Sequence, residues 1–136
     1  MKNKINKKVK FREKFRPFAP AILEENVKDF FEVQENSDFM EKALKIKANK
    51  RKLIPSVTHI DGTGRLQTVN RKTNKKFYDL IYKFYNKTGI PVLLNTSFNI
   101  QGEPIVCSVE DAIKNFYLSG LDELYIGDFL IKKNNK

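Results

Sequence analysis

The spacing of apolar and polar positions changes period several times along the chain, which is typical of a mixed α/β protein and not of a helical bundle or a β-sandwich. Residues 24–32 carry an apolar stripe at helical spacing, so we expect a short helix there. Residues 5–11 are basic with apolar positions between the charges, and they predict a strand that ends before Pro17 and Pro20, which restrict any helix. The pattern of residues 35–52 fits a strand between polar loops as well as it fits a helix.

The pattern becomes more regular in the second half of the chain. Residues 53–60 are apolar and β-branched, residues 65–69 alternate, and the DGTG sequence between them is a turn signal, so together they predict a hairpin. An amphipathic helix follows, with Asn74 as its N-cap and Gly89 as its C-cap.

The last third of the chain predicts a strand, a helix and a second strand. Residues 92–94 form a continuous apolar run of the kind that a buried strand shows. Ser108 is followed by two acidic residues and begins a helix that Gly120 closes. The final strand, in residues 123–133, contains Gly127, which marks a turn or a bulge.

Length and composition indicate one compact domain. A chain of 136 residues that is 40% hydrophobic and 12% aromatic can bury a core. Cys107 is the single cysteine, which excludes an internal disulfide, and it follows an apolar pair, so we expect it to be a small buried hydrophobe. The N-terminus lacks the apolar stretch of a signal peptide, and no apolar run is long enough to cross a bilayer. We therefore expect a cytoplasmic protein without membrane contact.

The net charge of +10 is concentrated near the N-terminus. Residues 1–16 contain eight lysines and arginines against Glu13 alone, and a second basic run occupies residues 45–52. Such charge favours a polyanionic partner, namely nucleic acid, a nucleotide triphosphate or an acidic protein surface, and it does not choose among them. The alternative is a solvated lysine-rich surface, which we favour for Lys2, Lys4 and the C-terminal tail.

Small polar side chains follow the apolar run at residues 92–94, at the end of a strand where α/β sheets hold ligands. They donate and accept hydrogen bonds, as a ligand with carbonyl and phosphate oxygens requires: Asn95, Thr96, Ser97 and Asn99. Gly102 lets the backbone approach a ligand closely. The Glu103 carboxylate can hold a ribose hydroxyl or a Mg²⁺ ion on a triphosphate, or merely cap backbone amides. The alternative interpretation of the whole cluster is a polar turn that caps the next element.

Three cations alternate on one face of the strand predicted near the N-terminus, namely Lys10, Arg12 and Arg16. Convergent lysine and arginine side chains bind nucleotide and acyl phosphates, because arginine supplies a bidentate fork and lysine a point charge. A strand with one solvated basic face has the same pattern, so both interpretations stay open.

The turn around DGTG offers a third set of candidates. His59, the only histidine, lies two residues before Asp61, and Arg65 follows the turn. His59 can be a base, a ligand anchor or a structural residue at a strand end, and we favour the structural role because a catalytic histidine needs a positioned partner. For Asp61, the alternative to a place in the site is that it shapes the turn and nothing more. No second histidine or cysteine stands at ligand spacing in the sequence, so no metal site is predicted.

Four long motifs follow one another along the chain: KFREKFRPFAPAILEE, IPSVTHIDGTGRLQTV, TGIPVLLNTSFNIQGEPIV and DAIKNFYLSGLDELYIGDFLIKK. In this order they resemble the C-terminal domain of the NodU/CmcH family of O-carbamoyltransferases, over about residues 5–133 of a 1–136 domain with basic tails. The resemblance implies a YrdC-like fold of the α/β (α+β) class, in which a twisted mixed sheet with packed helices surrounds a concave basic cavity in a single domain.

The resemblance also implies an activity. It implies ATP with Mg²⁺ and carbamoyl phosphate as substrates, a carbamoyladenylate intermediate, release of pyrophosphate, and transfer of the carbamoyl group to the hydroxyl of a small-molecule acceptor. Such a site needs no covalent nucleophile, because positioning the anions and neutralising the charge that develops on phosphorus supply most of the barrier reduction.

Residue roles follow from the resemblance. Lys10 and Arg12 would face the phosphates, with Arg16 as a further candidate. Lys10, Arg12 and Ser97 together would be the catalytic residues. The remaining candidates would bind the nucleotide and the carbamoyl group or line the same cavity: His59, Asp61, Arg65, Asn95, Thr96, Asn99 and Glu103.

Members of this family also carry an N-terminal domain that holds a metal and binds the acceptor. This chain begins at Met1, shortly before the first motif, so we expect a split subunit with a separately encoded N-terminal partner, a truncated gene or a shortened chain. The competing hypotheses are a nonenzymatic basic RNA-binding module and an inactive remnant. Few aromatic side chains are predicted beside the basic runs, which argues against stacking on single-stranded nucleic acid.

Overall fold

The computed structural model describes residues 1–33 and 35–133, which form two compact units. The central unit is Pro17–Thr96, and the terminal unit joins Met1–Arg16 to the residues from Ser97 onward. The C-terminal tail predicted from the sequence extends into residues 134–136, which lie outside the described residues.

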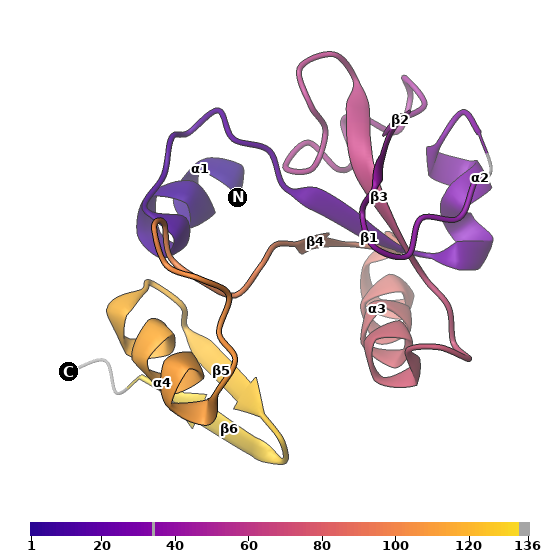
Figure 1. Cartoon of the computed structure of the whole chain (residues 1–136). Coiled ribbons are helices and arrows are strands. Elements are labelled where there is room, and N and C mark those ends of the chain that lie inside the picture. Colours follow the sequence, from indigo (N-terminus) through magenta and orange to yellow (C-terminus); the bar gives the residue numbers. More distant parts are fainter. Residues whose placement is uncertain (34, 134–136) are drawn as a thin grey trace. The chain divides into compact units, whose positions relative to one another are not determined.

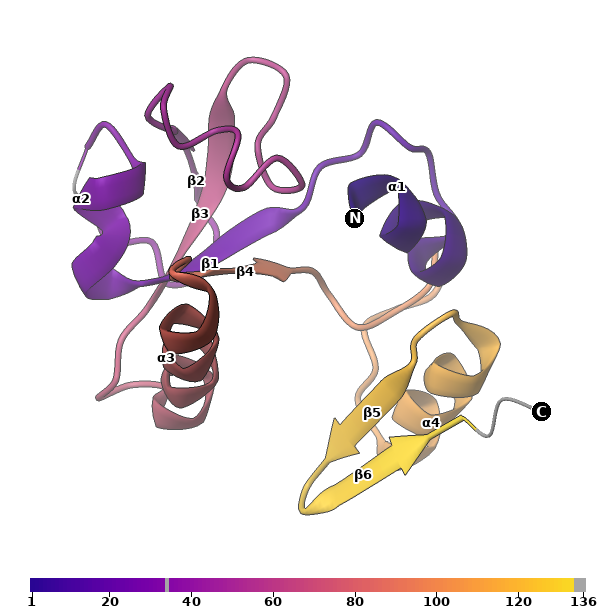
Figure 2. The ribbon, with the colours of Figure 1, turned by 180° about the vertical axis from the view of Figure 1, so that it is seen from behind.

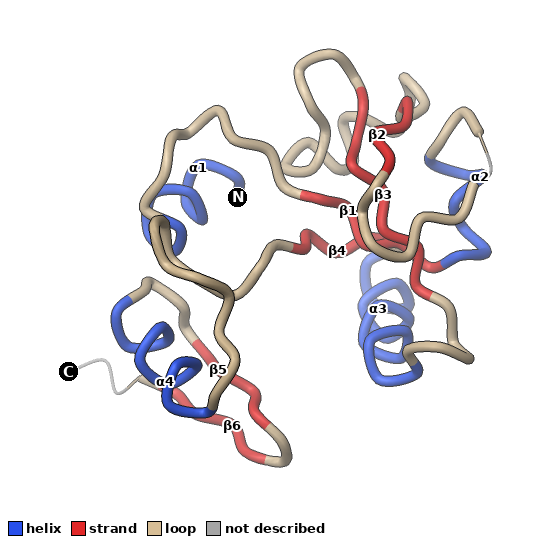
Figure 3. Tube along the Cα trace, in the orientation of Figure 1, coloured by secondary structure: helices blue, strands red, loops and turns tan. Residues whose placement is uncertain are grey.

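The central unit is built on a four-stranded mixed sheet (Figures 1 and 3). In spatial order its strands are β2 (Lys42–Lys45), β3 (Thr63–Val69), β1 (Ala19–Leu23) and β4 (Val92–Asn95). Strand β1 runs parallel to β3 and antiparallel to β4, and β2 runs antiparallel to β3. The mixed α/β class predicted from the sequence is therefore confirmed.

Helix α3 (Lys75–Thr88) packs against β1 and β4, as both views of the ribbon show (Figures 1 and 2). The Asn74 side chain accepts a hydrogen bond from the backbone N–H of Phe77, and Gly89 ends the helix with a φ of 72°. Both predicted caps are confirmed. The core beneath the helix contains Ala21, Leu23, Val69 and Ile81. The short helix predicted in residues 24–32 is a 3₁₀ turn, Glu24–Asn26, followed by α2 (Val27–Phe30).

The hairpin predicted from residues 53–60 and 65–69 is wrong. Residues 53–60 form turns and not a strand, and the antiparallel neighbour of β3 is β2. The reason is that β3 has β2 on one edge and β1 on the other, so no edge of β3 is left for a third strand. Ile54 and Val57 are buried all the same. Of the two interpretations of residues 35–52, the strand is correct.

The terminal unit contains a helix and a two-stranded sheet from its C-terminal part. Helix α4 (Val109–Leu118) begins with a capping box, because the Ser108 side chain accepts from the backbone N–H of Asp111 and the Asp111 carboxylate accepts from that of Ser108. Strands β5 (Glu123–Ile126) and β6 (Phe129–Lys132) pair antiparallel, with Gly127 in the turn at a φ of 57°. Phe116, Ala112 and Leu124 form the buried core between α4 and the sheet.

The strand predicted in residues 5–11 is also wrong. The chain forms α1 (Lys2–Ile5) and then a π-helical turn, η1 (Asn6–Lys10), so Lys10, Arg12 and Arg16 do not lie along one strand face. The physical reason is that Asn6 and Lys10, four residues apart, are both buried and make polar contacts inside the unit. The Nδ2 group of Asn6 donates to the carbonyl of Arg16 at 2.9 Å. Apolar alternation is therefore a poor guide where the buried side chains are polar.

Backbone contacts attach this N-terminal helix to the C-terminal part of the terminal unit. The N–H of Gly120 donates to the carbonyl of Lys8 at 2.6 Å, and the N–H of Gln101 donates to the carbonyl of Lys10 at 3.1 Å. A side chain at position 120 would place its Cβ only 2.7 Å from that Lys8 carbonyl oxygen, so the close approach requires glycine.

The environment of Cys107 differs from the buried apolar one that the sequence predicts. Cys107 is exposed, and its thiol donates to the Asp111 carboxylate at 3.4 Å. The hydrogen bond and the negative charge of Asp111 raise the pKa of the Cys107 thiol, so the nucleophilic thiolate is disfavoured. Across residues 1–33 and 35–133, no helix has the length and apolar character needed to span a membrane.

Candidate functional site

Lys10 and the loop after residue 96 meet inside the terminal unit. The Lys10 Nζ group donates to the backbone carbonyls of Ser97 at 2.9 Å and Asn99 at 2.7 Å. It also lies 2.5 Å from Asn99 Oδ1 and 3.4 Å from Ser97 Oγ. Lys10 is only 3% exposed. A buried ammonium therefore lies against the hydroxyl and amide groups that the sequence predicts as ligands, although 87 and 89 residues separate them along the chain.

The local fold explains this convergence. Lys10 is the last residue of the π-helical turn η1, and Phe11 then adopts a left-handed φ of 51°, which ends the helix. The hydrogen bond from Gln101 N–H to Lys10 O fixes the same helix end against the loop. Ser97 Oγ donates to Asn99 Oδ1 at 2.7 Å, so the two loop side chains also hold each other.

The charge on Lys10 is sensitive to its surroundings. Burial lowers the pKa of Lys10 from 10.5 to about 8, and the positive charge of Arg12 acts in the same direction. The ammonium form predominates below that pH, and an anion placed beside Nζ would stabilise it further.

Stability should depend on pH through this group. The folded protein releases the Lys10 proton near pH 8, whereas the unfolded chain holds it until about pH 10.5. The unfolded state binds more protons in this window, so the free energy of unfolding of the wild-type protein should rise between pH 8 and 10.5 relative to that of Lys10→Met. Urea unfolding of both proteins at three pH values in this range measures the difference. A difference that stays constant or falls with pH would contradict the assignment.

The other two N-terminal cations lie in different surroundings. Arg12 Nε donates to Asn6 Oδ1 at 2.8 Å, so Arg12 is joined to the buried part of the N-terminal helix. Arg16 is exposed and pairs with Glu13 at 3.6 Å, an arrangement of little energetic weight.

Glu103 connects the loop to helix α4. Its backbone carbonyl accepts from Asn99 Nδ2 at 2.8 Å. Its carboxylate accepts from Asn115 Nδ2 at 3.1 Å and pairs with Lys114 at 3.3 Å. The sequence pattern predicts a helix that begins at Ser108 and closes at Gly120, and it assigns no role to Asn115. The signal that could have revealed it is an asparagine among the apolar positions of a helix.

In the central unit, His59 and Asp61 organise the turn before β3. The Asp61 carboxylate accepts from the backbone N–H and the hydroxyl of Thr63, at 2.9 and 2.8 Å, which lowers the pKa of Asp61. The Thr63 hydroxyl also lies 3.0 Å from His59 Nδ1, and the backbone N–H of His59 donates to Thr63 O at 2.8 Å. These contacts fit the structural roles that the sequence left open for both residues.

The remaining candidates also lie in the central unit. Arg65 is exposed on β3, opposite Ala43 of β2. Asn95 ends β4 and donates to Gln67 Oε1 at 2.6 Å, and the half-buried Thr96 follows it. Lys10 contacts Ser97 and Asn99 within the terminal unit, which also contains Arg12, Arg16 and Glu103. The other candidates lie in the central unit: His59, Asp61, Arg65, Asn95 and Thr96.

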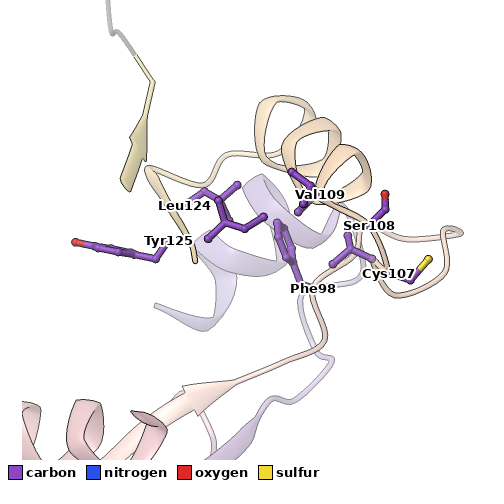
Figure 4. Close-up of a pocket in the computed structure, with 9 residues that line it drawn as sticks. Phe98, Cys107, Ser108, Val109, Leu124 and Tyr125 are labelled. Atoms are coloured by element: carbon purple, nitrogen blue, oxygen red, sulfur yellow. The ribbon is translucent and has the colours of Figure 1, made fainter. Parts of the chain in front are cut away.

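An apolar hollow of about 490 Å³ lies between α4 and β5, and Phe98 of the loop after residue 96 lines part of it (Figure 4). The side chains of Phe98, Val109 and Leu124 face one another there, whereas the Tyr125 ring points away. Phe98 stands between Ser97 and Asn99 in sequence. Neighbouring residues of the loop therefore line the hollow and contact Lys10. Within residues 1–33 and 35–133, no group of three or more histidine, cysteine, aspartate or glutamate residues is arranged to hold a metal ion.

Residues 1–133 match the family described as carbamoyltransferase C-terminus. The chain belongs to this family. Nodulation protein NolNO of Sinorhizobium fredii is 48% identical over 135 residues, which cover 97% of this chain and 20% of that protein. Nodulation protein NolO of Bradyrhizobium diazoefficiens is 47% identical, over 97% of this chain and 25% of its own length. An uncharacterized protein of Methanocaldococcus jannaschii is 48% identical, over 97% of this chain and 26% of its own length.

The family assignment confirms the resemblance drawn from the four motifs and supports a function of the transferase class. As a carbamoyltransferase C-terminal domain, the chain spans about a fifth to a quarter of the length of these curated relatives. The greater part of each relative therefore has no counterpart in these 136 residues.

Proposed function

We propose that this chain binds ATP and carbamoyl phosphate and forms the activated carbamoyl group of an O-carbamoyltransferase. The observation that carries the proposal is the contact of the buried Lys10 ammonium with Ser97 and Asn99. A fixed cation beside hydroxyl and amide groups suits an anionic ligand that also offers carbonyl and hydroxyl groups, as a carbamoyl nucleotide does.

The proposed reaction is a phosphoryl-centred substitution. Water hydrolyses carbamoyl phosphate to inorganic phosphate and carbamate. A carbamate oxygen attacks the α-phosphorus of ATP, the bond from that phosphorus to the α,β-bridging oxygen breaks, and pyrophosphate departs with this oxygen, leaving carbamoyladenylate. Lys10 neutralises the charge that grows on the non-bridging oxygens, and Mg²⁺ accompanies the triphosphate as part of the substrate.

The Lys10 ammonium already has a nearby acceptor for each of its protons. An ammonium has three protons, and four oxygens lie within 3.5 Å of Nζ, of which Ser97 Oγ at 3.4 Å is the most distant. An incoming phosphate oxygen would have to displace one of these acceptors, and the Ser97 hydroxyl could donate to the same ligand only by giving up its bond to Asn99 Oδ1.

Transfer to the final acceptor, a small molecule with a hydroxyl group, is assigned to an N-terminal domain. This part of the proposal rests on the short share of each longer relative that the chain covers.

The test uses the purified chain with MgATP and carbamoyl phosphate. We expect saturable MgATP binding by calorimetry and pyrophosphate release that requires carbamoyl phosphate. Ser97→Ala should weaken MgATP binding by roughly 10- to 100-fold, the value of one hydrogen bond to a charged ligand. Absence of nucleotide affinity, together with salt-sensitive RNA binding that Ser97→Ala leaves unchanged, would instead support the RNA-binding module. Absence of both would indicate an inactive remnant.

A further inference from the structure

Asn115 is a buried polar residue on the packed face of helix α4. It is 4% exposed, and its neighbours in sequence and along the helix, Phe116 and Ala112, belong to the apolar core. Asparagine has a low preference for the interior of a helix, and leucine, which has the same branched shape but a larger volume, is both a better helix former and a better core residue. The residue at this position is therefore not the one that stability alone would favour.

The contacts of Asn115 satisfy one end of its amide. Nδ2 donates to the Glu103 carboxylate at 3.1 Å and to the backbone carbonyl of Asp111 at 3.3 Å. Oδ1 is buried and has no hydrogen-bond partner among residues 1–33 and 35–133. A buried acceptor without a donor costs free energy, so Asn115 destabilises the helix while its Nδ2 group holds Glu103.

Glu103 passes this constraint to the candidate site. Its backbone carbonyl accepts from Asn99 Nδ2, and Asn99 in turn offers its side-chain and backbone oxygens to Lys10. Two anchors thus hold the loop of residues 97–103: Lys10 at one end and Asn115, through Glu103, at the other.

We propose that Asn115 is a positioning residue that fixes Glu103 and thereby the orientation of Asn99 beside the Lys10 ammonium. The proposal rests on the proposed function for its effect on ligand binding, since Asn115 itself need not touch ATP or carbamoyl phosphate. In this proposal, Asn115 makes helix α4 less stable at the place where the loop must be held, as is common at functional sites.

The test compares Asn115→Leu with the wild-type chain. We expect the midpoint of urea unfolding to stay the same or to rise, and MgATP binding to weaken by roughly tenfold, because a small displacement of a ligand-holding loop is costly. A purely structural asparagine would give the opposite pattern, with lower stability and unchanged affinity. Should Asn115→Leu fail to fold, Asn115→Ala, which removes the same bond without adding bulk, takes its place.

Two control variants act on the same carboxylate. Lys114→Met removes the exposed ion pair to Glu103 and should leave MgATP affinity within about twofold of wild type. Glu103→Gln keeps an oxygen that can accept from Asn115, so it should bind MgATP more tightly than Asn115→Leu.

A second readout does not depend on ATP. In the protein with ¹³C-labelled lysine side chains, the NMR titration of Lys10 should shift in Asn115→Leu and remain unchanged in Lys114→Met. Failure of the wild-type chain to bind MgATP would overturn the proposed function, and the Lys10 titration would still decide the positioning role. Wild-type affinity and an unchanged Lys10 titration in Asn115→Leu would overturn the positioning role alone.

Discussion

Replacing Lys10 with methionine is expected to weaken MgATP binding by a factor of about 100 or more and to abolish pyrophosphate release that depends on carbamoyl phosphate. The substitution removes the charge that lies against Ser97 and Asn99 and also the donor to both of their backbone carbonyls. Methionine retains most of the buried chain length, so the loss falls mainly on charge and hydrogen bonding. Calorimetry with MgATP and a coupled pyrophosphate assay measure the two effects.

Lys7→Met is the matched control for this experiment. Lys7 lies on the same helical turn and carries the same charge, but it is exposed. The affinity of Lys7→Met for MgATP should lie within about threefold of that of the wild-type protein, because an exposed charge contributes little at physiological salt. Equal losses in the two variants would mean that general positive charge, and not a site around Lys10, attracts the nucleotide.

Phe116→Ala should lower the free energy of unfolding by about 3–5 kcal/mol, the usual cost of removing a buried aromatic ring. Phe116 is fully buried in the core of the terminal unit, packs edge to face with Tyr117 at 5.2 Å, and has the Lys133 ammonium 4.9 Å from its ring centre. Urea denaturation followed by circular dichroism measures the loss.

Tyr117→Ala provides the comparison on the adjacent position. Tyr117 is 60% exposed, so its truncation removes an aromatic ring without opening a cavity and should cost less than about 1 kcal/mol. A loss in Phe116→Ala no larger than that in Tyr117→Ala would show that the terminal unit does not depend on this core.

Local signals in the sequence are sufficient for the elements whose ends are fixed by nearby residues. The caps of α3 at Asn74 and Gly89, the capping box of α4 and the turn at Gly127 all use contacts over a few residues. The segments that are predicted wrongly depend on distant partners. Residues 53–60 have strand-like composition, but both edges of β3 are already paired with other strands, and residues 5–11 bury polar side chains instead of apolar ones.

The same distinction applies to the candidate site. The chemical types of Lys10, Ser97 and Asn99 indicate phosphate and amide recognition, but their spacing along the chain cannot reveal that Lys10 and Ser97 touch across 87 residues. Asn115 escapes notice in the sequence because a single polar residue in an apolar helical pattern has meaning only when its partner, Glu103, is known.

The glycine contact between Gly120 and Lys8 has a consequence for synthesis of the protein. The N-terminal helix finds its packing partner more than a hundred residues later, so it leaves the ribosome long before it can dock, while Pro17–Thr96 can already complete its sheet. Until residue 120 has left the ribosome, the strongly cationic N-terminal segment of the nascent polypeptide cannot make this contact.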